Sequence, residues 1–245
     1  MVQPLFFTPL ARNLKVGESF TLSGDEGKHA ATVKRLRASE GLQLTDGTGI
    51  RISAIVIENK GQSLEVRITE ISDEPLPELQ ITLVQALAKG DRDELAIQAA
   101  TELGATEIVP WQANRCVSKW EGPKLQKGVA RWQTIVVEAV KQSLRVHTPK
   151  VQAALNTSEL AKTVASFDLV LVLDPTSEVS IKSVAPTSGR VAIVVGPEGG
   201  IEDTELALLE EAGAKRVHLG NGILRTSTAG LAAISALLTL GSSWD

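Results

Sequence analysis

The stretch VAIVVGPEGGIEDTELALLEEAG, residues 191–213, decides the fold of this chain. It begins as a fully apolar run, breaks at Gly196-Pro197, presents Glu198, and then adds two more glycines before a helical pattern starts. A fully apolar strand that leads into a helix is typical of a parallel sheet covered on both faces. Glycine lets the backbone approach a ligand closely and proline fixes one dihedral angle, so this turn predicts a rigid binding loop.

The same alternation of strand and helix fills the chain beyond residue 78. We expect strands in residues 79–87, 104–112, 168–175, 190–200 and 216–220, and helices in residues 91–103, 131–144, 203–212 and 226–240. In an open parallel sheet, ligands bind at the carboxyl ends of the strands. The candidate binding loops are therefore LVLDP (171–175), VVGPEGG (194–200) and VHLGNGILRTSTAG (217–230). Neither the dinucleotide fingerprint nor the phosphate loop of nucleotide hydrolases occurs, which leaves both chemistries without support.

The first 74 residues have a different pattern, rich in short strands. Runs at residues 19–24, 41–47, 51–59 and 63–72 are separated by turn residues, and one helical patch interrupts them at 24–41. Strands at this spacing predict a small β-barrel. Pro75 and Pro77 in the acidic SDEPLPELQ mark the boundary. We therefore predict two domains, 1–74 and 78–245.

Composition limits the classes of protein that remain. The chain has 245 residues, one cysteine and three histidines. A single thiol excludes an internal disulfide, and the scattered histidines give a metal site little support, so we expect no metal. No run approaches the roughly 20 apolar residues that would span a bilayer, and no signal-peptide pattern begins the chain. We expect a cytoplasmic protein without a membrane partner.

The net charge of −4 argues against a polyanionic partner, but the distribution of charge argues for one. Basic residues crowd residues 115–150, where Glu121 and Glu138 are the acids, and a second cluster lies in residues 28–37. Each cluster alone favours a solvated face, whereas the two together leave a solvated face and a polyanionic partner as equal alternatives. Trp111 and Trp120 flank the longer cluster and either stack on a base or belong to the core.

Several motifs resemble one known family. VVGPEGGIEDTEL and LGNGILRTSTAGLAAISAL closely resemble the C-terminal signature of the SPOUT methyltransferases, and within them the RsmE family. KGDRDELAIQAATELGATEIVPWQANRC (89–116), RWQTIVVEAVKQSLR (131–145) and HAATVKRLRASEG (29–41) are similar to further segments of that family. The resemblance implies methylation of N3 of a uridine in 16S ribosomal RNA of the small subunit, with S-adenosylmethionine as cofactor. It also implies a PUA-like β-barrel, an α/β domain with a C-terminal deep trefoil knot, and a homodimer.

The resemblance assigns roles to residues. Arg225 would stabilise the uracil anion or anchor a phosphate, and Glu198 would be either the base for the N3 proton or a group that holds its loop. The implied cofactor site comprises Leu173, Gly196, Pro197, Glu198, Gly199, Gly200, Leu219, Gly220, Ile223, Leu224, Arg225, Thr226, Thr228 and Ala229. The expected RNA contacts are Lys28, Lys34, Arg35, Arg37, Lys89, Arg92, Arg115, Lys119, Gln142 and Arg145.

The chain departs from the family pattern at a few positions. Gly222 and Ser227 stand where the family usually has arginine and glutamate, Lys141 replaces an acid, and Leu144 replaces a glycine. These changes keep a second hypothesis open, an RNA-binding or ribosome-assembly protein with a knotted domain that has lost catalysis. The apolar helix at 226–240 is hydrophobic on nearly every side, so it is either buried within the chain by the sheet or covered by a partner, and we expect a dimer.

Overall fold

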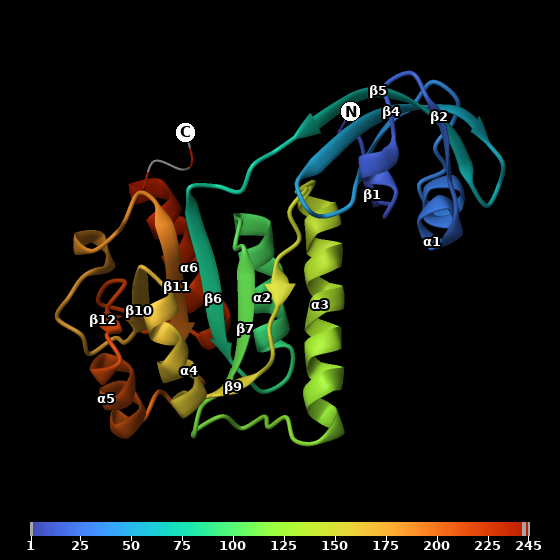
Figure 1. The fold of residues 1–245 in the computed structure, drawn as a ribbon. Helices are drawn as coiled ribbons and strands as arrows, with labels where there is room; N and C mark the ends of the chain where they lie inside the picture. Colours follow the sequence, from blue (N-terminus) through green and yellow to red (C-terminus); the bar gives the residue numbers. More distant parts are fainter. Residues whose placement is uncertain (1, 242–243, 245) are drawn as a thin grey trace. The chain divides into compact units, whose positions relative to one another are not determined.

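The computed structural model describes residues 2–241 and 244, which belong to two compact units (Figure 1). The first unit comprises Met1–Leu76 and Val140–Thr148, and the second comprises Pro77–Ala139 and Pro149–Asp245. Residues 242, 243 and 245, at the end of the second predicted domain, lie outside the described residues. No helix within the described part of the chain is both long and apolar enough to cross a membrane.

The first unit is built on a five-stranded sheet in the order β1-β3-β4-β5-β2. Its strands alternate buried and exposed residues, because one face packs on a core that includes Leu42, Ile52 and Val66. β1 pairs with β3 in parallel and the other pairs are antiparallel. The elements are β1 (Leu5–Phe7), η1 (Ala11–Asn13), β2 (Ser19–Leu22), α1 (Gly24–Lys28), η2 (His29–Val33), β3 (Gly41–Thr45), β4 (Ile50–Asn59) and β5 (Leu64–Asp73).

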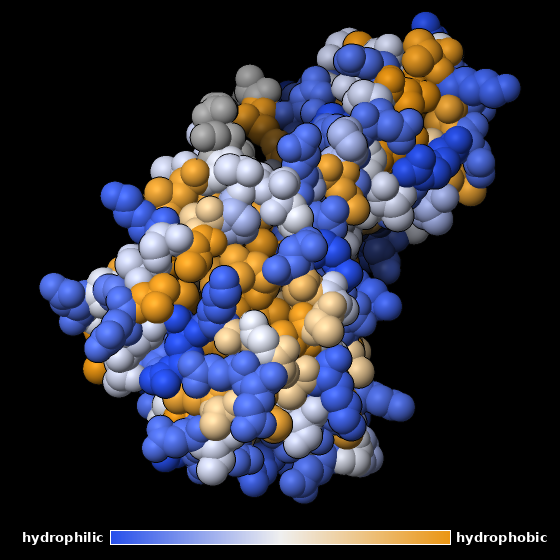
Figure 2. Space-filling view, turned by 60° about the vertical axis from the view of Figure 1, so that its left-hand side comes forward, coloured by the Kyte–Doolittle hydropathy of each residue, from blue (hydrophilic) through white to orange (hydrophobic). Residues whose placement is uncertain are grey.

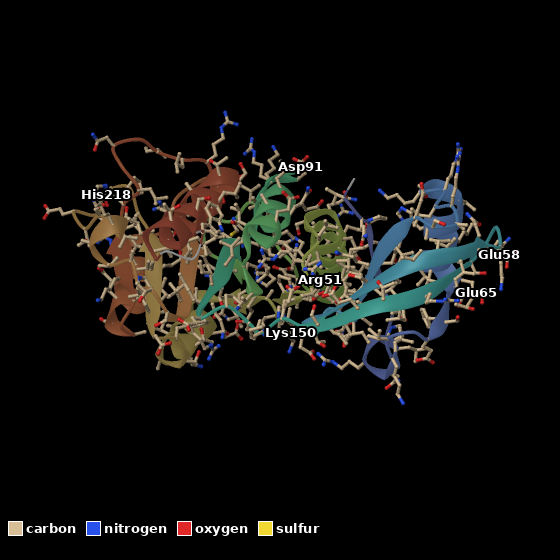
Figure 3. All side chains as sticks on the ribbon, turned by 90° about the horizontal axis from the view of Figure 1, so that it is seen from above. Arg51, Glu58, Glu65, Asp91, Lys150 and His218 are labelled. Atoms are coloured by element: carbon tan, nitrogen blue, oxygen red, sulfur yellow. The ribbon has the colours of Figure 1, made fainter. Side chains whose placement is uncertain are left out.

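Charged side chains occupy both ends of the β4–β5 hairpin (Figure 3). Glu58 and Glu65 face each other across the two strands, and Lys60 in the turn bonds to Glu65 at 2.6 Å and lies 3.8 Å from Glu58. At the other end, Arg51 pairs with Glu74 and donates to the Leu144 carbonyl at 3.0 Å. The Arg51 contacts bind the end of helix α3 (Pro123–Ser143) to this unit.

Helix α3 is followed directly by Leu144, whose backbone is left-handed with φ 56°. The Arg145 N–H donates to the Val140 carbonyl at 3.1 Å, which is the hydrogen bond of a Schellman motif. Glycine is favoured at this position because a Cβ atom clashes with the backbone when φ is positive. Leu144, one of the departures from the family pattern, therefore places backbone strain at the end of the helix.

Two substitutions of Leu144 should measure this strain. Leu144→Gly and Leu144→Ala both remove the leucine side chain beyond Cβ, but only glycine relieves the left-handed strain. We expect the glycine variant to have the larger free energy of unfolding, by about 1 kcal/mol. In an ordinary helix position the order is reversed. Urea unfolding of both variants decides the matter, and an alanine variant at least as stable as the glycine variant contradicts the strain.

The second unit contains a seven-stranded parallel sheet in the order β12-β10-β11-β6-β7-β8, with β9 also paired to β7. This confirms the predicted α/β fold with a parallel sheet. Its strands are β6 (Leu79–Ala86), β7 (Glu107–Gln112), β8 (Lys150–Val151), β9 (Leu155–Asn156), β10 (Leu169–Leu173), β11 (Gly189–Val195) and β12 (Lys215–Val217). Its helices are α2 (Arg92–Leu103), the greater part of α3, α4 (Thr157–Thr163), α5 (Asp203–Glu211) and α6 (Thr226–Leu240), with short turns η3 (Val164–Ser166) and η4 (Ile181–Ser183).

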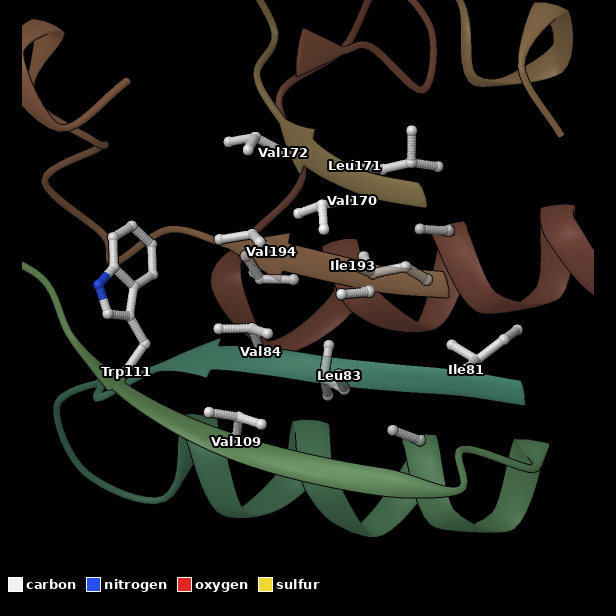
Figure 4. Close-up of a cluster of buried hydrophobic side chains, with 14 of the residues drawn as sticks. Ile81, Leu83, Val84, Val109, Trp111, Val170, Leu171, Val172, Ile193 and Val194 are labelled. Atoms are coloured by element: carbon white, nitrogen blue, oxygen red, sulfur yellow. The ribbon is translucent and has the colours of Figure 1, made fainter. Parts of the chain in front are cut away.

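Apolar side chains of the central strands form the core of the second unit (Figure 4). Helix α6 packs against β6, β11 and α2. A Cβ at Gly230 would lie 2.9 Å from Leu83 and 3.3 Å from Val195, so glycine allows this helix to approach the sheet closely. The buried face of α6 includes Ala233, Ile234 and Leu237. The other face remains partly exposed, with Leu240 41% exposed.

Candidate functional site

Three neighbouring strands end at the same edge of the sheet. β10 lies between β12 and β11, with Leu173 opposite Val217 and Val172 opposite Val194. The segments that follow these strands line one cavity of about 590 Å³. This volume lies within the range of small-molecule and cofactor sites.

The cavity gathers nearly all of the predicted cofactor-site residues. Among the predicted residues, only Gly199 and Thr228 are absent from its lining. Further wall residues belong to the three candidate loops without having been assigned to the cofactor site: Asp174, Pro175, Val195, Val217, His218 and Gly222. Arg92 was expected as an RNA contact, and the sequence did not indicate Thr176, Ile201, Asp203 and Leu206. Thr176 and Ile201 directly follow predicted loops, and His218 directly follows β12 (Figure 3). Their closeness in sequence to the ends of β10, β11 and β12 is the feature that could have indicated them.

The glycine-rich elbow after β11, residues 196–201, is a tight turn. The Gly200 N–H donates to the Pro197 carbonyl at 2.9 Å, and Gly200 has φ +75°. A Cβ on Gly196 would lie 2.6 Å from Cγ1 of Ile201, so the elbow can fold back only with glycine there. A Cβ on Gly199 would instead meet Cβ of Arg115 at 3.2 Å. Gly199 thus faces a neighbouring loop and not the cavity.

Arg115 supports the elbow from that neighbouring loop. Its Nη1 donates to the Gly199 carbonyl at 3.1 Å, and its Nε lies 3.5 Å from Glu202. The Asn114 side chain also donates to Glu202 at 2.8 Å. Because its guanidinium is engaged in this way, Arg115 has a structural contact in addition to the RNA role that the sequence suggested.

Glu198 is bound to the start of helix α2. Its Oε1 accepts from the Lys89 N–H at 3.2 Å and from Nη1 of Arg92 at 2.9 Å. Burial raises the pKa of Glu198, but hydrogen bonds from its own backbone and from Lys89, together with Arg92, outweigh burial and leave the pKa below its usual range. Glu198 is therefore an anchored, ionised carboxylate.

Arg225 lies at the junction between the last loop and helix α6. Its carbonyl accepts the N–H groups of Thr228 and Ala229 at 2.9 Å, which fixes its backbone as the N-cap. Its side chain is exposed and borders the cavity. The guanidinium is therefore placed to meet a group that enters from solvent.

A second ion pair lies in the cavity wall. Nε of Arg216 donates to Asp174 at 2.7 Å, and Asp174 is only 8% exposed. Burial raises the pKa of Asp174, but hydrogen bonds from Thr176 and Arg216 outweigh it, so the pKa lies below its usual value. Asp174 is therefore ionised at neutral pH, Arg216 balances its charge, and its oxygens are already engaged by protein donors.

The predicted RNA contacts occupy several different environments. Lys28, Lys34, Arg35 and Arg37 are exposed in the α1–β3 segment of the first unit. Lys89, Lys119 and Gln142 are also exposed, whereas Arg145 is half-buried and burial lowers the pKa of its guanidinium. Arg92 borders the cavity in its ion pair with Glu198.

Trp111 belongs to the core of the second unit, and Trp120 packs against that core. Trp111 is fully buried, and its Nε1 donates to Thr157 at 3.2 Å. Trp120 is half-buried and packs edge-to-face on Trp132, with ring centroids 5.1 Å apart. The core alternative is thus the correct one for Trp111.

Comparison with known proteins places these features in a class. The model of an RNA methyltransferase domain matches residues 74–238, and that of an RNA methyltransferase PUA domain matches residues 22–69. The fold and the site thus define an RNA methyltransferase with a PUA domain.

Individual relatives narrow the class. Ribosomal RNA small subunit methyltransferase E of Mycobacterium tuberculosis is 42% identical over 251 residues, covering 100% of this chain and 95% of the relative. The Bacillus subtilis protein of the same name is 32% identical, with 96% of each chain covered. The chain belongs to the ribosomal RNA small subunit methyltransferase E family.

Solved structures agree with this assignment. The Neisseria gonorrhoeae ribosomal RNA small subunit methyltransferase E bound to S-adenosyl methionine matches with a TM-score of 0.87 and 33% identity over 98% of each chain. A putative methyltransferase of Legionella pneumophila, in complex with the bound cofactor SAM, matches with a TM-score of 0.86 and 29% identity over 98% of each chain.

Proposed function

We propose that this protein transfers the methyl group of S-adenosylmethionine to N3 of a uridine in 16S ribosomal RNA of the small subunit, in the cytoplasm. The observation that carries the proposal is the cavity at the ends of β10, β11 and β12, in a chain of this family. The intact cavity also favours catalysis over the alternative of a knotted assembly protein that has lost it.

The cavity suits S-adenosylmethionine in size and in chemistry. Apolar side chains such as Leu173, Ile201 and Leu219 provide a surface for an adenine ring, and glycine backbone at the elbow allows close approach. The wall carries both carboxylates, Glu198 and Asp203, and guanidinium groups, Arg92 and Arg225, a mixture of charges that suits a ligand with a zwitterionic amino-acid group. When bound, S-adenosylmethionine supplies an electrophilic methyl group on a sulfonium.

The proposal includes the deep trefoil knot of the SPOUT fold. β12 forms one edge of the sheet, beyond β10, whereas the next helix, α6, packs against β6 and β11. The chain in residues 218–225 must therefore cross the end of β10 to reach the start of α6. This crossing supports a threaded C-terminal segment, although knots are among the rarest topologies.

Arg225 acts at the reacting base, whereas Glu198 holds the loop beside it. Uridine N3 becomes nucleophilic only when its proton leaves, so a cation near the uracil carbonyls assists by stabilising the anion. Arg225 suits this role because its guanidinium is always charged and borders the cavity from an exposed position. Glu198, with its lowered pKa and its bonds to Lys89 and Arg92, is a weak base and holds the elbow to helix α2.

RNA binding should depend on the exposed cations of the first unit. Reversing two of them, in a Lys34→Glu, Arg37→Glu variant, should weaken RNA binding and lower the slope of log affinity against log salt by roughly two, because each lost phosphate contact lowers it by about one. S-adenosylmethionine affinity should not change.

The matched control is Lys15→Glu, an exposed lysine of the same unit outside the cluster. Fluorescence titrations with small-subunit RNA at several salt concentrations measure the slope. A slope equal to that of Lys15→Glu shows that the cluster is a solvated face. Arg115 is a poorer probe because its loss also disturbs Gly199 and Glu202.

The protein is further proposed to act as a homodimer. The sheet and helix α2 cover part of α6, but Leu240 on this helix remains 41% exposed. Apolar side chains also gather on the side of the molecule drawn in the space-filling view (Figure 2). Light scattering at micromolar concentration should give twice 26.0 kDa. Leu240→Glu, on the exposed face, should lower this mass, whereas Thr239→Glu beside it should not. A wild-type mass near 26.0 kDa, that of one chain, would contradict the proposed dimer.

Two measurements test the proposed function. Calorimetry should show binding of S-adenosylmethionine to the purified protein, and a protein that binds RNA without binding S-adenosylmethionine would instead be the assembly factor. Mass spectrometry of 16S RNA from cells that lack the protein should show one uridine without its N3 methyl group. An unchanged methylation pattern refutes the assigned substrate.

A further inference from the structure

Gln85 is a polar residue at the centre of the apolar sheet. It lies near the carboxyl end of β6 and is 0% exposed. Its Nε2 donates to the Ala86 carbonyl at 3.1 Å and to Oγ1 of Thr226 at 2.9 Å. Its Oε1 is buried, and no described residue donates a hydrogen bond to it.

The bond to Thr226 continues to the binding loops. The Thr226 hydroxyl donates to the Gly196 carbonyl at 2.8 Å. A hydroxyl has one proton, so a Thr226 that donates to Gly196 can only accept from residue 85. The chain therefore runs in one direction, from the Gln85 amide through the Thr226 hydroxyl to the Gly196 carbonyl.

This chain joins three separate segments at the cavity. Gln85 belongs to the central strand, Thr226 opens helix α6, and Gly196 opens the elbow after β11. Thr226 and Gly196 both line the cavity, whereas Gln85 lies behind them. The hydroxyl that joins the two ligand-facing segments is thus held by an amide that does not line the cavity.

The amide is unfavourable for stability. A buried acceptor without a donor costs free energy, and a side chain of similar volume without polar atoms would avoid that cost. Methionine fills the same space without an acceptor, although it also leaves the Thr226 hydroxyl without its donor. A polar group kept at such a cost indicates a function other than stability.

We propose that Gln85 is a positioning residue for the cofactor cavity, which acts through Thr226 to hold the start of helix α6 against the Gly196 elbow. The inference rests on the proposed function, since it assumes that this cavity binds S-adenosylmethionine. Gln85 directs the Thr226 hydroxyl toward Gly196, because the amide donates to the hydroxyl oxygen and leaves its one proton for the Gly196 carbonyl.

Gln85→Met, Thr226→Val and their double variant, with Thr226→Ser as the control, test this chain of hydrogen bonds by calorimetry and urea unfolding. Gln85→Met should raise the Kd for S-adenosylmethionine about tenfold, the equivalent of one buried hydrogen bond, without lowering the free energy of unfolding. Thr226→Val should raise the Kd similarly. The double variant should lose no more affinity than Thr226→Val alone, because both changes break the same chain. Thr226→Ser retains the hydroxyl and should recover most of the affinity lost in Thr226→Val.

The outcomes separate the inference from the proposed function. A wild-type protein that does not bind S-adenosylmethionine refutes the proposed function. If the wild type binds and Gln85→Met binds equally well, only the positioning role fails. If the losses of S-adenosylmethionine affinity add up in the double variant, Gln85 and Thr226 act independently, which overturns the proposed hydrogen-bond chain. A Gln85→Met protein that is unfolded or strongly destabilised makes Gln85 a structural residue, which also overturns the proposal.

Discussion

Replacing Arg225 by methionine should lower kcat by roughly a hundredfold to a thousandfold, the usual cost of removing one group that stabilises a developing negative charge. Methionine keeps much of the length and the apolar stem of arginine but cannot stabilise a uracil anion. The backbone bonds from Thr228 and Ala229 to the Arg225 carbonyl do not require the side chain, so helix α6 should still start at the same residue. The Kd for S-adenosylmethionine should therefore change by much less than kcat.

Arg225→Lys is the matched control for this prediction. Lysine retains the charge but not the planar pair of donors, so we expect an intermediate kcat. Single-turnover methylation of RNA measures the chemical step separately from RNA binding. If Arg225→Met loses RNA affinity and keeps its single-turnover rate, the guanidinium is a phosphate anchor and takes no part in the chemistry.

Gly196→Ala should raise the Kd for S-adenosylmethionine by roughly tenfold to a hundredfold, the effect expected of overpacking by one methyl group. The added Cβ would lie 2.6 Å from Cγ1 of Ile201, so the elbow must open to relieve the clash. Opening moves the Gly196 carbonyl away from the Thr226 hydroxyl, which donates to it at 2.8 Å. Calorimetry measures the affinity directly.

Gly199→Ala tests whether this loss is specific. The elbow is the same, but the new Cβ would meet Arg115 at 3.2 Å, outside the cavity lining. We expect an affinity within a few-fold of the wild type. Equal losses for the two variants show that the elbow tolerates no change at all, and the orientation of Gly196 then has no special role.

Local sequence patterns predict the parallel sheet well. The apolar runs of β10 and β11 and the start of α6 at Thr226 follow directly from hydrophobic periodicity. Helix α4 and the short strands β8 and β9 were not predicted. Strands β8 and β9 have two residues each, which is too short for a periodic pattern. Helix α4 begins at a capping box between Asn156 and Glu159 and shows no clear apolar stripe.

The sequence likewise predicts only part of the candidate site. Glycine, proline and the conspicuous loops pointed to the elbow and to the segment that ends at Arg225. The partners of Glu198 could not be predicted, because Lys89 and Arg92 lie more than a hundred residues away along the chain and meet it only through the strand order. The role of Gln85 could not be predicted for the same reason. Gln85 lies within a hydrophobic strand, and only the fold shows that its amide bonds to Thr226.

The most direct measurement uses the purified protein, S-adenosylmethionine with a labelled methyl group, and small ribosomal subunits from cells that lack the protein. Digestion of the 16S RNA and mass spectrometry of the nucleosides identify the methylated atom. We expect label in 3-methyluridine from a single position, and its near absence with the Arg225→Met protein. Label on another base or on a ribose, or no label with a wild-type protein that binds S-adenosylmethionine, would contradict the assignment.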